Sequence, residues 1–165
     1  MKLNLGCGCS KIKGFINIDA NPEFKPDLIG DILDIDFQPN SIDEIIAYHI
    51  LEHIPKSKQE FLLSKIYKWM KPESKLYISV PDLIKLFKLY QLYEDELILN
   101  YIFGSGENNL FKHYWGFTET YLDILLKKVG FIYLEVNTNL VGFATEKYRG
   151  SNVSINKIYI KGKNG

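Results

Sequence analysis

The chain has 165 residues, of which 46% are apolar, and this is enough for one well-packed core. Lysine and arginine together number 20, and so do aspartate and glutamate, so no net charge attracts nucleic acid or an anionic membrane. We therefore expect a single domain spanning residues 1–165. It should act on a small or neutral partner, with no nucleic acid and no membrane involved.

The amino-terminal segment and the cysteines narrow the class of protein further. Residues 1–6 lead directly into a predicted strand, with no apolar run long enough for a signal peptide or membrane span, so we expect a cytoplasmic location. Cys7 and Cys9 are the only cysteines, too few for a disulfide framework and two ligands short of a zinc cage. We interpret both as free thiols.

Short apolar runs alternate with longer segments of helical periodicity, a pattern typical of an α/β protein with a mostly parallel sheet. Two helices can be predicted from the residues at their ends. Ser57 and Glu60 have the spacing of a capping box, which predicts a helix over about residues 57–70. Another helix should begin at Thr118 and end at Gly130. The seven predicted strands cover residues 2–6, 15–19, 27–30, 43–48, 75–80, 131–137 and 156–162.

A glycine turn follows the first predicted strand. The sequence LNLGCG, residues 3–8, places Gly6 and Gly8 at the carboxyl end of that strand, where open parallel sheets bind nucleotides. Asp19 ends the second strand, where a carboxylate can accept hydrogen bonds from both ribose hydroxyls. Together these features predict half of a nucleoside site, although each alone also fits a tight turn or a helix cap.

The connection between these two strands departs from a dinucleotide fingerprint. Only eight residues, 7–14, separate the strands, whereas a crossover helix needs about a dozen. Lys11 stands at the third glycine position, and no long helix is available to hold a pyrophosphate. The sequence therefore argues against NAD and FAD, and favours a nucleoside ligand that lacks phosphates.

Several segments together resemble the class I S-adenosylmethionine-dependent methyltransferases, in particular small enzymes often encoded among surface-polysaccharide and glycan genes. LNLGCG is similar to the family's first motif, and INIDA (16–20) to its acidic ribose motif. Residues 30–54 resemble the third and fourth motifs, and residues 111–131 the last helix and sixth strand. The resemblance implies a Rossmann-like, seven-stranded, mostly parallel sheet with helices on both faces and an antiparallel last strand pair. One departure is Lys71-Pro72-Glu73-Ser74, where the family usually has Lys-Pro-Gly-Gly.

This resemblance implies S-adenosylmethionine as the cofactor and S-adenosylhomocysteine as its product. The glycine turn would hold the methionine part of the cofactor, Asp19 the ribose, and Asp31 with Ile32 the adenine. Taken alone, Asp31 also fits an ordinary loop or capping position. The full set of predicted cofactor-binding residues is Leu5, Gly6, Cys7, Gly8, Asp19, Ala20, Asp31, Ile32, Tyr48 and His49.

The segment YHILEHIP, residues 48–55, contains H-x-x-E-H, a spacing that binds zinc in some metalloproteases. That geometry needs more than one helical turn, and Pro55 disfavours helical backbone at Ile54. No further zinc ligand is identifiable in the sequence, so we predict no metal site. Because the segment follows the fourth strand, Tyr48 and His49 should instead face the glycine turn across the crevice of the sheet.

Methyl transfer to an oxygen requires removal of a proton, for which histidine has a suitable pKa. We predict His49 and His113 as catalytic residues, and expect His53 only to orient Glu52. His113 lies in the aromatic segment FKHYWGF (111–117), which could form the rim of a sugar site. The alternative is that His113 packs between aromatic rings and takes no part in the chemistry.

The segment before this rim is the only insertion large enough to recognise an acceptor. Leucines and tyrosines at helical spacing predict one long helix over about residues 82–103, with Asp82 as its N-cap and Gly104 and Gly106 at its end. Many relatives cover their substrate with amino-terminal helices, whereas this chain starts at its first predicted strand. The resemblance therefore implies that residues 83–117 form a substrate-side insertion that takes over this role. Its tyrosines could also form a homodimer, or a partner protein could cover the substrate.

We therefore expect a methyltransferase that acts on a hydroxyl of a sugar, a glycan or another small metabolite. The main alternative is a non-catalytic methyltransferase-like module that binds the cofactor and acts as a partner subunit. A nicotinamide dehydrogenase is disfavoured by the short connection between the first two strands. A zinc hydrolase is disfavoured by the proline after H-x-x-E-H.

Overall fold

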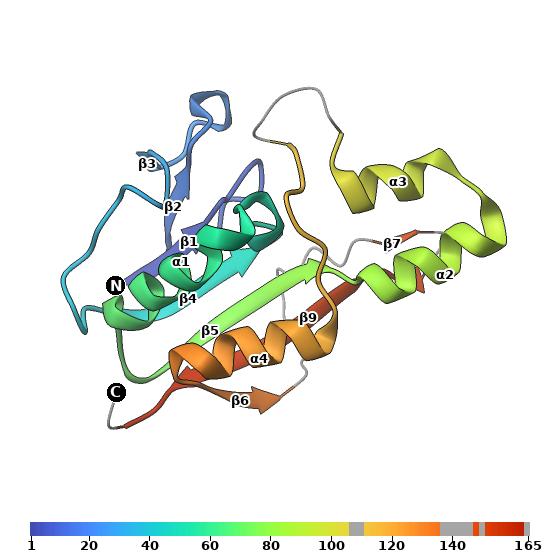
Figure 1. Cartoon of the computed structure of the whole chain (residues 1–165). Coiled ribbons are helices and arrows are strands. Elements are labelled where there is room, and N and C mark those ends of the chain that lie inside the picture. Colours follow the sequence, from blue (N-terminus) through green and yellow to red (C-terminus); the bar gives the residue numbers. More distant parts are fainter. Residues whose placement is uncertain (106–110, 136–146, 149–150, 164–165) are drawn as a thin grey trace.

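The structure is a computed structural model of the whole chain, and it describes residues 1–105, 111–135, 147–148 and 151–163. One seven-stranded sheet has the order β3-β2-β1-β4-β5-β9-β6 (Figure 1). Strands β1 to β5 run parallel, and β9 runs antiparallel between β5 and β6. The sheet strands are β1 (Lys2–Leu5), β2 (Ile16–Asp19), β3 (Leu28–Ile29), β4 (Ile42–Tyr48), β5 (Met70–Pro81), β6 (Phe131–Glu135) and β9 (Ser154–Lys161). This confirms the predicted Rossmann-like fold.

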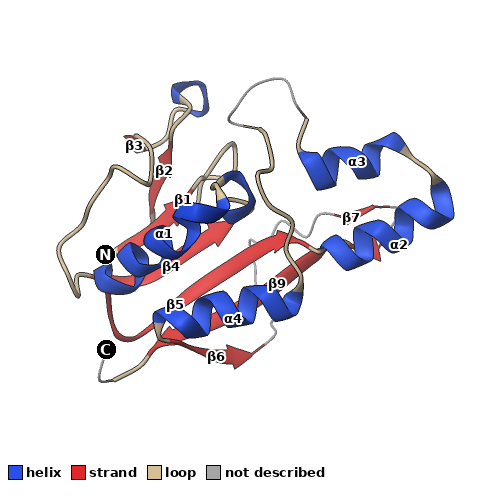
Figure 2. Cartoon of the chain, viewed as in Figure 1, coloured by secondary structure: helices blue, strands red, loops and turns tan. Residues whose placement is uncertain are grey.

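Helices α1 (Lys56–Trp69) and α4 (Glu119–Val129) lie side by side on one face of the sheet (Figure 2). Alternate residues of the central strands point toward them, so Leu76, Ile78 and Val80 of β5 are completely or almost completely buried. A short pair of strands, β7 (Lys147–Tyr148) and β8 (Ser151–Asn152), lies outside the main sheet. Among the described residues, no helix combines the length and apolar character needed to cross a bilayer.

The start of α1 differs from the prediction. Its N-cap is Pro55, no side chain caps it, and Ser57 lies inside the first turn, so the predicted capping box is wrong. Proline already has the φ angle that a helix entry requires, which lets α1 begin earlier than the Ser57 signal. Glu60 instead accepts a hydrogen bond from Lys128 of α4 at 2.6 Å.

The predicted long helix is two helices, α2 (Leu83–Tyr93) and α3 (Glu96–Phe103). Asp82 caps α2 as expected, but Glu94 takes a left-handed conformation and Asp95 caps α3. Aspartate satisfies backbone N–H groups at a helix start, so an aspartate inside a helical pattern can restart the helix in a new direction. The two helices form an arm beyond the carboxyl end of β5 (Figure 1).

The predicted strand positions are confirmed to within a few residues, with two differences at β5 and β9. Strand β5 begins at Met70 rather than Lys75, and β9 begins at Ser154 rather than Asn156. The predicted end of the sixth strand, residues 136–137, lies outside the described residues, as does Gly106.

A buried ion pair joins α4 to β9. The Lys157 side chain is only 3% exposed, and its Nζ lies 2.8 Å from Asp123 and 2.9 Å from Glu119. The Tyr159 hydroxyl also donates to Asp123. Burial by itself raises the pKa of Asp123, but hydrogen bonds from Lys157 and Tyr159 outweigh it and hold that pKa below its ordinary value of 3.8.

We predict that Asp123→Ala lowers the free energy of unfolding by about 2 kcal/mol, because it leaves the buried Lys157 with only an exposed partner. Glu119→Ala is the matched control and should cost less than about 1 kcal/mol, since Glu119 is 65% exposed. Because the pKa of Asp123 is lowered by folding, its stabilising effect is present above pH 3.8 and is lost as the pH falls below that value. Urea unfolding at neutral and acid pH measures both effects. Equal losses in the two variants would contradict this account.

Candidate active site

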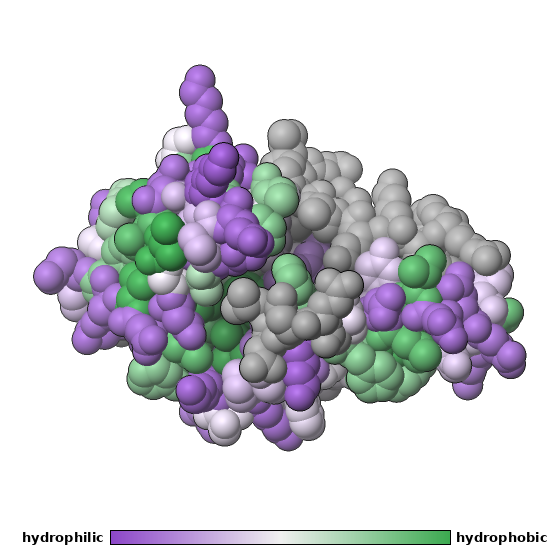
Figure 3. Space-filling model, turned by 90° about the horizontal axis from the view of Figure 1, so that it is seen from above, coloured by the Kyte–Doolittle hydropathy of each residue, from purple (hydrophilic) through white to green (hydrophobic). Residues whose placement is uncertain are grey.

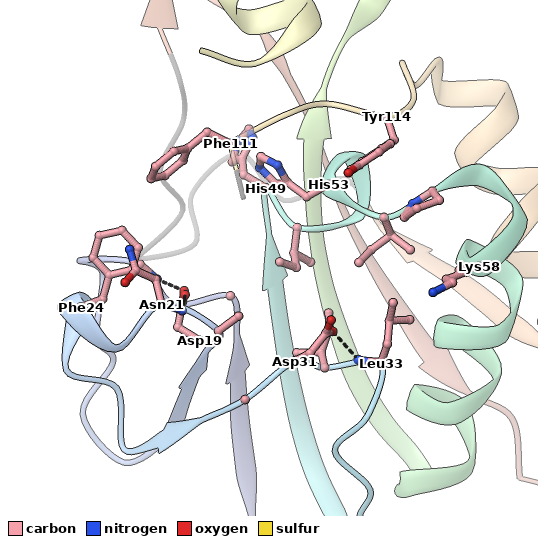
Figure 4. A pocket seen from close by; sticks show the side chains of 18 residues that line it. Asp19, Asn21, Phe24, Asp31, Leu33, His49, His53, Lys58, Phe111 and Tyr114 are labelled. Atoms are coloured by element: carbon pink, nitrogen blue, oxygen red, sulfur yellow. Dashed lines mark hydrogen bonds between the residues drawn. The ribbon is translucent and has the colours of Figure 1, made fainter. Parts of the chain in front are cut away.

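A cavity of about 460 Å³ opens at the carboxyl ends of β1, β2 and β4 (Figure 4). Parallel strands that end at one edge of a sheet bring their following loops together, which is why residues far apart in sequence meet here. The first wall comes from the loops after β1 and β2, and consists of Gly6, Gly8, Asp19, Ala20, Asn21 and Phe24. The loop after β3 adds Gly30, Asp31, Ile32 and Leu33.

The glycine turn has left-handed backbone at both glycines, with φ angles of 61° at Gly6 and 47° at Gly8. A Cβ atom at Gly6 would lie 2.5 Å from Cδ1 of Ile50, so a side chain there would require Ile50 to shift. A Cβ atom at Gly8 would meet nothing within 4 Å among the described residues. The turn is therefore closed by packing at Gly6 and open at Gly8.

Asp19 joins this turn to the loop after β2 through its two carboxylate oxygens. Oδ2 accepts a hydrogen bond from the Gly8 N–H at 2.8 Å, and Oδ1 accepts one from the Asn21 N–H at 2.9 Å. Each oxygen has a second lone pair, so the carboxylate can still accept hydrogen bonds from a ligand in the cavity. Asp31 lies on another side of the cavity, where its Oδ1 accepts from the Leu33 N–H at 2.8 Å.

Across the cavity from Asp19 lies the segment after β4, with Phe111 and Tyr114 beside it (Figure 4). The Tyr114 N–H donates to the backbone oxygen of Glu52 at 2.8 Å, which ties the aromatic segment to the turn after β4. This side is lined by His49, Ile50, His53, Ile54, Pro55 and Lys58. The turn is a short 3-10 helix, Leu51–His53, and Ile54 is extended, as expected for a residue before proline.

His49 is held on all sides. Its backbone is left-handed, with φ of 51°, a conformation that costs energy in a residue other than glycine and is often found at functional sites. Its Nδ1 lies 3.1 Å from Oε1 of Glu52, and its Nε2 lies 3.2 Å from Ser79 Oγ and 3.3 Å from Ser154 Oγ. Both serines are buried, so this arrangement positions the ring and exposes no nucleophile.

Glu52 is 1% exposed and pairs with His49, not with His53 as the sequence predicted. His49 lies before the N-cap of the 3-10 turn, and its left-handed backbone leaves its Nδ1 within hydrogen-bond distance of Glu52 Oε1. Burial alone raises the pKa of Glu52, but the hydrogen bond from His49 and the charges of His49 and His53 lower it overall, so the carboxylate is ionised. Among the described residues, its Oε2 has no hydrogen-bond partner.

His53 and His113 lie against each other, with ring centroids 4.7 Å apart. Each donates from Nδ1 to a backbone carbonyl, His53 to Lys112 at 3.0 Å and His113 to Tyr101 at 3.1 Å. Desolvation lowers the pKa of His113, and the neighbouring His53 adds to this, so its neutral form is favoured. A ligand atom of His53, one of His113 and a carboxylate oxygen of Glu52 all lie within 4.8 Å of one another.

Not every predicted site residue lines the cavity. Gly6, Gly8, Asp19, Ala20, Asp31, Ile32 and His49 do, whereas Leu5, Cys7 and Tyr48 do not, and His113 borders a separate small cavity. Leu5 and Cys7 are buried, and burial followed by the charge of Asp19 raises the pKa of the Cys7 thiol. Burial also raises the pKa of the Tyr48 hydroxyl. The roles assigned to these four residues stay predictions.

Other cavity residues escaped the sequence analysis. Phe111 and Tyr114 belong to the aromatic segment that it singled out as a rim, so a signal for them existed. Phe24 lies in a short 3-10 helix after β2, and Lys58 lies on the first turn of α1. No sequence pattern distinguishes either residue from an ordinary surface residue. The cavity suits a nucleoside, since it has the volume of a small-molecule site and its apolar walls carry a few carboxylates and exposed backbone groups.

Residues 3–78 match a family model described as "Methyltransferase domain", and this stretch contains β1 to β4, α1 and most of β5. Solved structures share the whole fold. A SAM-dependent methyltransferase from Methanosarcina mazei is 20% identical, with a TM-score of 0.68, and the match covers 98% of this chain and 92% of that one. By this match residues 3–78 are a methyltransferase domain, and the whole chain has the fold of S-adenosylmethionine-dependent methyltransferases. S-adenosylmethionine is the cofactor of the similar proteins.

Two further structures resemble this methyltransferase across 98% of its length. One is 1,6-didemethyltoxoflavin-N1-methyltransferase from Burkholderia thailandensis with bound S-adenosylhomocysteine, at 14% identity, a TM-score of 0.63 and 70% coverage of that chain. The other comes from a complex of a methyltransferase with the Trm112 methyltransferase activator of Haloferax volcanii, at 13% identity, a TM-score of 0.66 and 82% coverage. A search of curated proteins gives no significant match.

We predict that Gly6→Ala lowers the free energy of unfolding of this methyltransferase by about 2 to 3 kcal/mol, from left-handed strain and the overlap with Ile50. Gly8→Ala is the matched control and should cost about 1 kcal/mol, because only the strain applies. Ile50→Val removes the nearest clashing atom and should recover part of the loss in the Gly6→Ala background. Urea unfolding of the four proteins measures these values. Equal effects of the two glycine variants would contradict the proposed packing.

Proposed function

We propose that this methyltransferase transfers the methyl group of S-adenosylmethionine to a hydroxyl of a sugar or another small metabolite. The observation that carries the proposal is the arrangement of the cavity. Asp19 and the glycine turn line one side, and a cluster of Glu52, His53 and His113 stands behind the opposite side. A cofactor bound along the first side would direct its methyl group toward these histidines.

The chain's own residues suit the parts of the cofactor in the following way. Asp19 would accept hydrogen bonds from the ribose hydroxyls, and the open Gly8 side of the turn would admit the methionine part. Asp31 would accept from the adenine amine, while Ile32 and Leu33 supply apolar surface. The remaining predicted contacts, Leu5, Cys7 and Tyr48, would support this wall from beneath.

The reaction is a displacement at the methyl carbon. A lone pair of the acceptor oxygen forms the new C–O bond, the C–S bond breaks, and its electron pair goes to sulfur, which leaves as a neutral thioether. The acceptor proton must also leave. The protein contributes alignment of the two reactants at about 3 Å and exclusion of water.

The histidine cluster supports a hydroxyl acceptor. The Nδ1 atoms of His53 and His113 donate to carbonyls, so each neutral ring keeps a lone pair on Nε2 that can interact with an acceptor or its proton. Both ring nitrogens of His49 are already within hydrogen-bond distance of partners, so we assign His49 the role of positioning Glu52. Of the two predicted catalytic histidines, His113 is the one we retain for acceptor activation, together with His53.

Asp19→Ala should weaken binding of S-adenosylhomocysteine by about 10- to 100-fold, because it removes hydrogen bonds to a charged acceptor. Asp34→Ala is the control, since Asp34 is exposed in the same region and does not line the cavity. Calorimetric titration measures both affinities, with circular dichroism as the test of folding. Equal affinity in the two variants would contradict the proposed cofactor orientation.

The acceptor class has its own test. The enzyme should convert S-adenosylmethionine to S-adenosylhomocysteine when sugars or polyols are added as acceptors. Primary amines of similar size should give no such conversion. His113→Asn should reduce this turnover at least 10-fold while leaving S-adenosylhomocysteine affinity unchanged. Methylation of amines but not of hydroxyls would contradict the proposal.

We propose residues 83–117 as the substrate-side insertion. A second copy of the chain or a partner protein would cover the substrate side of this insertion. Apolar side chains are exposed on the α2–α3 arm, including Phe87, Leu92 and Leu97 (Figure 3). An activator accompanies the similar Haloferax volcanii enzyme, which supports a partner protein as one alternative. Sedimentation of the purified chain distinguishes a homodimer from a monomer that needs a partner protein. A cytoplasmic location is proposed from the amino-terminal sequence, and a place among polysaccharide-modifying enzymes on the resemblance alone.

A further inference from the structure

Two histidines and a buried glutamate converge beside the cavity, and we propose that Glu52, His53 and His113 bind a divalent transition-metal ion of the Zn²⁺ class. The sequence argued against a metal because H-x-x-E-H lacked a helix and a further ligand. Folding supplies that ligand from 60 residues downstream of His53, since His113 comes from the segment before α4. The site therefore uses only the last two residues of the H-x-x-E-H motif.

Glu52 carries the first argument. Its carboxylate is 1% exposed, and Oε1 is used by His49. Oε2 is buried without a hydrogen-bond partner among the described residues. A buried carboxylate oxygen without a partner is costly, and an ion at this position would satisfy it.

The two histidine rings carry the second argument. A backbone carbonyl can only accept a hydrogen bond, so the contacts to Lys112 and Tyr101 require the proton of each neutral ring to be on Nδ1. Nε2 of each ring then has a free lone pair. Imidazoles that bind metals are held in the same way, with the other ring nitrogen donating to a carbonyl or carboxylate.

The cluster is also built into the fold. The His113 N–H donates to the Phe103 oxygen at 3.0 Å, and the Tyr114 N–H donates to the Glu52 oxygen at 2.8 Å, so backbone hydrogen bonds hold the two segments together. The three ligand atoms lie within 4.8 Å of one another. Ligands of one zinc ion at about 2.1 Å lie roughly 3 to 4 Å apart, so a contraction of about 1 Å completes the site.

Two imidazoles and one carboxylate select the kind of ion. Mg²⁺ and Ca²⁺ prefer oxygen ligands throughout, whereas Zn²⁺ and its neighbours accept imidazole nitrogen. Three protein ligands leave a position open on the ion. Resting on the proposed function, we infer that this position would take the acceptor hydroxyl, lower its pKa and release its proton to water, so the ion would take over the activation of the acceptor from the Nε2 atoms of His53 and His113.

The test is metal binding by the purified, chelator-treated enzyme, with Zn²⁺ as the probe and Mg²⁺ as the comparison. One Zn²⁺ per chain should bind, measured by elemental analysis after dialysis, and Mg²⁺ should not compete. His113→Asn and His53→Asn should each weaken binding on the order of 100-fold, whereas Cys9→Ser should bind like the wild type. Substitution with Co²⁺ should give visible absorption without the near-ultraviolet charge-transfer band of thiolate ligands.

Titration with S-adenosylhomocysteine on the same samples checks that each variant is folded and separates this inference from the proposed function. Cofactor binding by the wild type without stoichiometric Zn²⁺ would overturn the metal site and leave the proposed function standing. Unchanged Zn²⁺ affinity in both histidine variants, or its loss in Cys9→Ser, would also overturn it. Zn²⁺ bound at these residues without transfer to any hydroxyl would keep the site and contradict the acceptor proposal.

Discussion

The hydrogen bond between Glu52 and His49 is the interaction on which the side of the cavity opposite Asp19 depends. A carboxylate that is 1% exposed stays ionised only if a partner compensates for its desolvation, and His49 is that partner at 3.1 Å. The backbone oxygen of Glu52 also accepts a hydrogen bond from the Tyr114 N–H. One buried acid therefore holds both the end of β4 and the aromatic segment that precedes α4.

The cofactor side follows a different principle. It is built from backbone geometry, because Gly6 and Gly8 adopt left-handed conformations and Asp19 locks the turn through backbone N–H groups. Such a turn needs no crossover helix, which explains how only ten residues, 6–15, can join β1 to β2. The cavity therefore combines the wall that we propose for the cofactor, formed by the loops after β1, β2 and β3, with a wall assembled from the segment after β4 and from Phe111 and Tyr114.

The parallel sheet joins the two walls. Strands β1, β2, β3 and β4 end at the same edge, so the loops after them meet in one cavity although they span residues 6 to 58. The arm of α2 and α3 extends from β5 beyond the same edge, and the chain returns along the cavity through Phe111 and Tyr114 (Figure 1). This return path is what brings His113 to His53.

Local patterns were enough to predict much of this arrangement. The strands, the glycine turn, the place of Asp19 at the end of β2 and the extended Ile54 before Pro55 all follow from short-range sequence signals, and each signal reflects a backbone preference that acts within a few residues. Element ends were less predictable where two signals compete. Pro55 starts α1 ahead of the Ser57 capping box, and Asp95 interrupts the long helix that the leucine and tyrosine periodicity indicated.

By itself, the sequence determined the α/β fold, because that fold depends on periodicity, and it predicted a nucleoside-type ligand from motifs within single loops, which the family resemblance narrowed to S-adenosylmethionine. Only the tertiary structure decided the partner of Glu52 and the meeting of His53 with His113. It also decided that Cys7 and Tyr48 lie outside the cavity lining. These are contacts between segments as many as 60 residues apart, or choices between the two faces of a turn. They depend on how helices and loops pack against the sheet, which no local pattern specifies.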